Sequence, residues 1–213
     1  MKEKFTIGFI DENKVWENKF KRFATDRFNV VTFSLTENTT IEKLISDIKN
    51  SQIDCLVVDF ELKESELIQF NGDEIINSIR KENPYFPLFV ITCQREDYVL
   101  NEIEDNDIVY MKSQIEENQD NFALRINNKI ERYKVKINQA YQEIERLAMI
   151  KTERVLTPME DEQLFEYYLF LGKIDPDEKY LPAHLISPNG FSQLNDFVEN
   201  TKQILEELKK NKI

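Results

Sequence analysis

In the first half of the chain, short apolar runs alternate with segments of helical periodicity. The runs that predict strands are Phe5–Ile10, Phe28–Phe33, Cys55–Phe60, Leu88–Cys93 and Ile108–Met111. The segments between them place apolar residues three and four positions apart, as in a helix that buries one face. This alternation predicts an α/β fold, a flavodoxin-like five-stranded parallel sheet with helices on both faces.

Three well-marked helices are predicted between these strands. They begin near Asn13, after Thr40 and after Gly72, and a weaker helix is predicted over Asp97–Ile103. Their predicted inward residues are Val15, Trp16, Phe20 and Phe23 in the first, Ile41, Leu44, Ile45 and Ile48 in the second, and Ile75, Ile76 and Ile79 in the third.

From about Gln119 the strand signal ends, and a long helix is predicted to about Val155. Its apolar residues recur in alternating steps of four and three, a spacing that keeps one seam facing a partner. They are Ile126, Ile130, Tyr133, Ile137, Ala140, Ile144 and Leu147. The seam either forms a coiled coil with a second copy, giving a homodimer through residues 126–147, or packs against later helices of its own chain.

The rest of the chain is also predicted to be helical. Thr157 caps a helix that ends near Gly172, prolines mark a loop over Lys173–Gly190, and a last amphipathic helix follows. The inward residues of that last helix are Leu194, Phe197, Val198, Thr201, Leu205 and Leu208. The predicted domains are therefore residues 1–118, the long helix over 119–155, and a helical output or interaction module over 156–213.

Composition narrows the classes of partner. The chain carries 28 basic and 40 acidic residues, a net charge of −12, which disfavours nucleic acid. No segment approaches the apolar length of a membrane span, and Phe5–Ile10 is too short for a signal peptide. Cys55 and Cys93 lie in apolar runs and are interpreted as buried reduced thiols. We therefore expect a cytoplasmic protein without a membrane or nucleic-acid partner.

Polar residues follow the ends of four of the five predicted strands. They are Asp11 and Glu12, Asp59, Thr92 and Lys112. Because the carboxyl ends of parallel strands meet at one edge, these groups are expected to converge. Three carboxylates in one place repel one another unless a divalent cation, most plausibly magnesium, neutralises them. One carboxylate could then act as a nucleophile toward a phosphoryl group, while lysine and threonine donate to its oxygens.

The order of these residues resembles the receiver domain of bacterial response regulators, over roughly residues 3–118. The resemblance implies that Asp59 is the phospho-acceptor, with Thr92 and Lys112 holding the phosphoryl oxygens. It also implies a magnesium ion bound by Glu12, by Asp59 and by the backbone carbonyl of Glu61.

In such a site Asp11 would reach the magnesium chiefly through water. The family takes its phosphoryl group from a sensor histidine kinase or a phosphotransfer protein. The resemblance thus implies a two-component signalling protein rather than an enzyme, which acts on an unknown downstream protein through contacts or dimer rearrangement. The C-terminal helices show no DNA-recognition pattern.

Two alternatives stay open, and departures from the family pattern favour the first of them. Lys63 and Ser113 stand where the family has prolines, and Val109 stands where an aromatic residue usually reports phosphorylation, with Tyr110 one step along. One step along a strand reverses the face. A pseudo-receiver, acting as a constitutive interaction scaffold, is therefore an alternative. A phosphatase of the haloacid-dehalogenase type fits less well, because its nucleophile follows the first strand and Asp59 follows the third.

Overall fold

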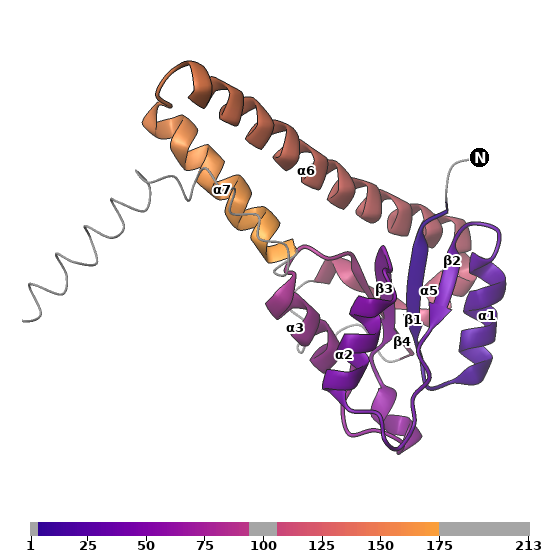
Figure 1. Cartoon of the computed structure of the whole chain (residues 1–213). Helices are drawn as coiled ribbons and strands as arrows, with labels where there is room; N and C mark the ends of the chain where they lie inside the picture. The colour runs from indigo at the N-terminus through magenta and orange to yellow at the C-terminus, as the bar shows by residue number, and fades with distance from the viewer. Residues whose placement is uncertain (1–3, 94–105, 175–213) are drawn as a thin grey trace, which may run out of the picture.

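The computed structural model describes residues 4–93 and 106–174, and a five-stranded parallel sheet lies at its centre (Figure 1). The strands are β1 (Thr6–Ile10), β2 (Asn29–Thr32), β3 (Cys55–Asp59), β4 (Leu88–Thr92) and β5 (Val109–Met111). Their order across the sheet is β2-β1-β3-β4-β5, and every neighbouring pair is parallel. The predicted flavodoxin-like sheet is confirmed.

Helices cover the sheet and extend beyond it. They are α1 (Lys14–Ala24), α2 (Ile41–Asn50), α3 (Gly72–Glu82), α5 (Lys112–Glu117), α6 (Gln119–Glu153) and α7 (Pro158–Ile174), with short 3-10 turns η1 (Leu62–Ser65) and η2 (Asn106–Ile108). Helix α7 runs back alongside α6, and both reach away from the sheet (Figure 1). None of the helices in the described part of the chain is long and apolar enough to cross a membrane.

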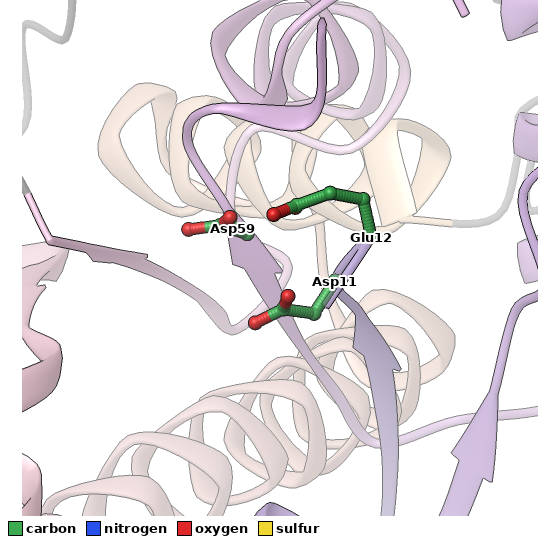
Figure 2. Close-up of side chains that lie close together, drawn as sticks. All are labelled: Asp11, Glu12 and Asp59. Carbon is green, nitrogen blue, oxygen red and sulfur yellow. The ribbon is translucent and has the colours of Figure 1, made fainter. Parts of the chain in front are cut away.

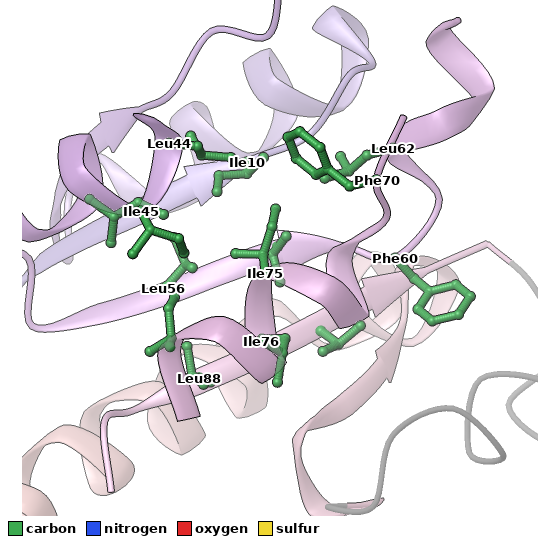
Figure 3. Close-up of a cluster of buried hydrophobic side chains, with 14 of the residues drawn as sticks. Ile10, Leu44, Ile45, Leu56, Phe60, Leu62, Phe70, Ile75, Ile76 and Leu88 are labelled. Carbon is green, nitrogen blue, oxygen red and sulfur yellow. The ribbon is translucent and has the colours of Figure 1, made fainter. Parts of the chain in front are cut away.

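Two separate hydrophobic clusters fill the two faces of the sheet. Side chains of α2 and α3, such as Leu44 and Ile76, pack on one face in the cluster that Figure 3 draws. Phe20 of α1 and Ile126 of α6 pack on the other face. All residues of β3 and of β4 are buried, as expected of central strands covered on both sides. The first turns of α6 thus belong to the layer that covers the sheet.

Two predictions about individual residues were wrong. Val15 is 63% exposed, because it precedes Phe20 by five positions and so lies about 140° away from it around the helix. Glu17 faces inward instead, where Lys14 and Lys21 each pair with its carboxylate at 2.6 Å. Cys55 is buried as predicted, but Cys93 is exposed. It follows Thr92, the last residue of β4, and so lies beyond the carboxyl end of that strand.

Four residues of the apolar seam of α6 are buried within the chain, and the other three, Tyr133, Ile137 and Ile144, are partly buried. Ile126 and Ile130 pack in the cluster beneath the sheet, whereas Ala140 and Leu147 pack against α7. Thr157 caps α7 as predicted, because its hydroxyl accepts from Glu160 N–H at 3.3 Å. Of the two alternatives for the seam, the structure favours packing inside one chain.

We expect Leu147→Ala to lower the free energy of unfolding by about 2–4 kcal/mol, because Leu147 is fully buried against α7. Met149→Ala, on the exposed side of the same helix, should change it by less than about 0.5 kcal/mol. Urea unfolding at two protein concentrations tests this. Internal packing predicts a midpoint independent of concentration, and a midpoint that rises with concentration would indicate a homodimer through the seam instead.

Three predictions lie outside the described residues. They concern the weak helix over Asp97–Ile103, the loop over Lys173–Gly190 beyond Ile174, and the last helix carrying Leu194 to Leu208. Helix α7 ends at Ile174, two positions beyond the predicted end. The division into residues 1–118, 119–155 and 156–213 stays a prediction.

Candidate functional site

Three carboxylates meet at the carboxyl edge of the sheet, where sequence analysis had placed them. Asp11 and Glu12 follow β1, and Asp59 ends β3, the strand that pairs with β1. One oxygen from each side chain lies within 4.8 Å of the others, and Figure 2 shows the three carboxylates turned toward a common space. Asp11 and Asp59 are only 4% and 2% exposed. The cluster is therefore a buried one at a strand-end edge.

Lys112 supplies the positive charge in this cluster. It is the first residue of α5, directly after the edge strand β5, and its side chain reaches across the intervening β4 to the acids. Its Nζ lies 2.9 Å from Asp11 Oδ2 and 3.1 Å from Asp59 Oδ1. The sequence-based prediction that Lys112 joins the acidic edge is confirmed in position.

Thr92 ends the strand that lies between the strand of Asp59 and the strand that precedes Lys112. It ends β4, the strand that pairs with β3 on one side and with β5 on the other. Thr92 is fully buried. All five residues selected from the strand ends thus come to one edge of the sheet.

Burial controls the electrostatics of the cluster. Desolvation raises the pKa of Asp59 to about 8, against the attraction of Lys112, and the nearby Asp11 and Glu12 carboxyls add to the rise. Burial also raises the pKa of Asp11, although Lys112 and the Asn13 N–H, which donates to Asp11 Oδ1 at 2.8 Å, oppose it. Only when all three carboxyls are ionised does the site, with one ammonium, carry an excess of negative charge.

The pKa of Lys112 moves in the opposite sense to what burial alone would cause. Desolvation lowers it, but the Asp59 and Asp11 carboxylates outweigh desolvation and raise the pKa above its usual value. The ammonium is therefore held protonated beside the acids, ready to donate to a second anion that arrives there.

The carboxylates fit a hard divalent cation. Asp11 Oδ2, Glu12 Oε2 and Asp59 Oδ1 are buried without a hydrogen-bond partner, and Lys112 compensates two of them only as an ion pair. Buried carboxylate oxygens in that state are costly, and oxygen-rich clusters are what magnesium and calcium bind. In residues 4–93 and 106–174, this is the one group of three or more potential metal ligands.

The loop after β3 brings the backbone close to Asp59. Gly72, the first residue of α3, lies so near that a Cβ there would be 2.2 Å from the carbonyl oxygen of Asp59. Its N–H donates to the carbonyl of Phe60 at 3.0 Å. Only glycine fits this approach. Sequence analysis had interpreted Gly72 merely as the start of a helix, because a close approach between backbones has no local signal.

Glu61 and Lys63 lie at the start of this loop. The Glu61 carbonyl accepts from Glu64 N–H at 3.3 Å in η1, and its predicted role as a magnesium ligand stays a prediction. Lys63, where the resemblance led us to look for a proline, donates its N–H to Asn71 Oδ1 at 3.0 Å, and its ammonium pairs with Glu74 at 2.9 Å. A proline could not make the first of these bonds.

The aromatic residue of β5, Tyr110, and its neighbour Val109 lie on opposite faces of the sheet. Val109 is buried in the cluster that includes α2 and α3. Tyr110 packs on the opposite face against Phe89 and Phe122, with ring centroids 5.6 and 5.2 Å apart, and its hydroxyl accepts from Arg125 at 3.1 Å. The reversal of faces expected from the strand periodicity is confirmed.

Comparisons with solved structures find receiver domains among the proteins to which this chain is similar. It is similar to a signal receiver domain of a putative Luxo repressor protein from Vibrio parahaemolyticus, at 15% identity and a TM-score of 0.46, covering 62% of this chain and 95% of that one. It is also similar to a response regulator receiver domain protein from Methanospirillum hungatei, at 18% identity and a TM-score of 0.47, covering 62% and 98%.

A third similar structure is a response regulator receiver protein from Sinorhizobium medicae, at 19% identity and a TM-score of 0.43, covering 62% of this chain and 94% of that one. No protein-family model matches the chain, and no curated protein matches it. The three structures each match about three fifths of this chain.

Proposed function

We propose that the chain accepts a phosphoryl group on Asp59 in a magnesium-dependent reaction, and passes the signal on through protein contacts. One observation supports this above the others. The buried carboxylate of Asp59 lies 3.1 Å from the Lys112 ammonium and within 4.8 Å of the Asp11 and Glu12 carboxylates. A purely structural strand end has no need of three carboxylates gathered in one buried place.

The proposed chemistry divides among the residues of the site. An Asp59 carboxylate oxygen attacks phosphorus, and the bond from phosphorus to the donor nitrogen of a phosphohistidine breaks, which leaves an acyl phosphate. Lys112 and Thr92 donate to the phosphoryl oxygens as the charge shifts. Magnesium, held by Glu12 and Asp59 with the Glu61 carbonyl, and reached by Asp11 through water, would supply positive charge beside both anions.

The partners follow from that chemistry. The donor is a sensor histidine kinase or a phosphotransfer protein, and the chain is a signalling protein rather than an enzyme that turns over a substrate. A phosphoryl group adds about −1.5 to −2 charges to an edge that is already acidic. Output through a downstream protein, rather than through DNA, is consistent with the net charge of −12.

Incubation with Mg²⁺ and acetyl phosphate, followed by intact-mass measurement, tests the proposal. We expect wild type to gain the mass of one phosphoryl group and Asp59→Asn to gain none. The matched control is Asp47→Asn, an exposed position of α2 remote from the cluster. It should behave as wild type. An equal gain in Asp59→Asn, or no gain in wild type with Mg²⁺ present, would contradict the proposal.

One observation favours a second candidate, a pseudo-receiver that acts as a constitutive scaffold. The buried Val109 replaces the aromatic switch, and Tyr110 is held on the far face by Arg125. A scaffold of this kind keeps its acids without accepting phosphate. The same mass measurement separates the two candidates, because a scaffold shows no gain with any donor.

A further inference from the structure

The ammonium of Lys112 has a third neighbour besides the two carboxylates. Its Nζ lies 5.4 Å from the centroid of the Trp16 ring. The Lys112 side chain is only 5% exposed, so the contact lies in a site from which most water is excluded. At this distance the negative face of an indole attracts a cation, and the attraction is stronger where the cation is desolvated.

The position of Trp16 is tied to the loop that carries Asp11. The N–H of Asn13 donates to Asp11 Oδ1 at 2.8 Å. The side chain of Asn13 caps α1, and its Oδ1 accepts from Val15 N–H at 2.9 Å and from Trp16 N–H at 3.4 Å. Trp16 therefore lies in the first turn of α1 and is held by the same Asn13 residue whose N–H orients Asp11.

The ring also links α1 to α5. Lys19, one turn after Trp16, places its Nζ 5.3 Å from the same ring centroid. Lys19 in turn pairs with Glu116 of α5 at 2.6 Å. Lys112 begins α5, so two contacts one helical turn apart hold the start of α5 against the first turns of α1. Trp16 is partly buried, and the ammonium groups of Lys19 and Lys112 both lie near its ring.

The geometry points to Trp16 as a positioning residue for Lys112, an inference that rests on the proposed function. The Asp11 and Asp59 carboxylates hold the ammonium as ion pairs at 2.9 and 3.1 Å, and an incoming phosphoryl group must draw it partly away from them. An aromatic face attracts the ammonium without using a donor in one fixed direction. Trp16 can therefore keep Lys112 in place while the ammonium turns from the carboxylates to the phosphoryl oxygens.

Two substitutions separate a ring contact from simple packing. Trp16→Phe keeps an aromatic face, and Trp16→Leu keeps an apolar side chain without one. With acetyl phosphate and saturating Mg²⁺, we expect Trp16→Leu to lower the maximal rate of phosphoryl incorporation about tenfold, and Trp16→Phe to retain most of it. The Mg²⁺ concentration for half-maximal rate should change little in either variant. Equal rates in the two variants, or a wild-type rate in Trp16→Leu, would overturn the inference.

Fluorescence gives a readout that needs no phosphoryl transfer. Trp16 is the single tryptophan of the chain, so the indole emission reports this ring alone. Lys112→Met should change that emission in protein without metal or donor. Lys14→Met is the matched control, since Lys14 lies on the same helix and its ammonium pairs with Glu17 at 2.6 Å. It should leave the emission nearly unchanged.

Circular dichroism checks that each variant is folded. If Lys112→Met does not fold, Lys112→Arg, which keeps the charge but moves its centre, takes its place. Emission identical to wild type in a folded Lys112 variant would overturn the inference. If the Lys112 variant changes the emission but wild type accepts no phosphoryl group, the result would contradict the proposed function and leave the ring contact standing.

Discussion

Raising the pH from 5 to 8 is expected to lower the free energy of unfolding of the metal-free protein by about 2–4 kcal/mol. The pKa of Asp59 is raised to about 8 in the folded chain, against about 3.9 for an unperturbed aspartate. Between these values the folded state holds a proton that the unfolded state has released. Stability therefore falls as pH rises, by up to about 1.4 kcal/mol per unit. The raised pKa of Asp11 acts in the same direction.

Magnesium is expected to reverse this loss. It binds the ionised carboxylates of the folded state and not the unfolded chain, so a hundredfold excess over its dissociation constant adds about 2.7 kcal/mol. The stabilisation should grow with pH, because more of the carboxylates are ionised. Thermal unfolding with EDTA or with Mg²⁺, at several pH values, measures both effects.

Asp59→Asn is the decisive variant in that experiment. Removal of one buried charge should make the metal-free protein more stable than wild type at pH 8, with a weaker dependence on pH and on Mg²⁺. Asp47→Asn, exposed on α2, should follow wild type throughout. Equal stability of wild type at pH 5 and 8, or full Mg²⁺ stabilisation of Asp59→Asn, would show that the acids do not form one coupled site.

The second large effect is expected at Gly72. Gly72→Ala should lower the free energy of unfolding by about 2–4 kcal/mol, because the new Cβ would lie 2.2 Å from the Asp59 carbonyl oxygen and 3.1 Å from Phe60 Cα. Backbone atoms cannot turn aside as a flexible side chain can. The end of β3 must then shift, so Mg²⁺ should also stabilise this variant less than wild type. Urea unfolding with and without Mg²⁺ measures both.

Gly172→Ala is the matched control. Gly172 lies within α7, and nothing is within 4 Å of where its Cβ would be. Alanine there should raise the free energy of unfolding by up to about 1 kcal/mol, because it is the better helix former. The same substitution thus has opposite signs at the two glycines. A Gly72→Ala protein as stable as wild type would show that the approach of α3 to β3 is looser than described.

Much of the fold could be predicted because its signals are local. The fully apolar run before Asp59 indicated a strand buried on both faces, and every residue of β3 is buried. Periodicity also placed Ile75 and Ile79 inward on α3, where they are buried. The prediction from periodicity was wrong for Val15. The Asn13 cap sets where α1 begins, and from that start Val15 lies outside the face that buries Phe20 and Phe23.

The sequence predicted which residues belong to the site, but not the contacts that they make with one another. Parallel strands carry their carboxyl ends to one edge, so Asp11, Asp59 and Lys112 could be grouped before any contact was known. The ion pairs at 2.9 and 3.1 Å, the burial that raises the pKa of Asp59, and the ring of Trp16 beside Lys112 had no signal of their own. Sequence analysis had interpreted Trp16 as a core residue.

Local sequence patterns predicted the order of strands and helices and the polar residues that follow four of the five strands, because periodicity and strand ends are properties of neighbouring residues. The tertiary structure alone decided how deeply the carboxylates are buried, which backbone Gly72 approaches, and that the seam of α6 is covered by the sheet and α7. Those features depend on groups far apart in the chain, whose distances and desolvation are defined only once the helices have packed on the sheet.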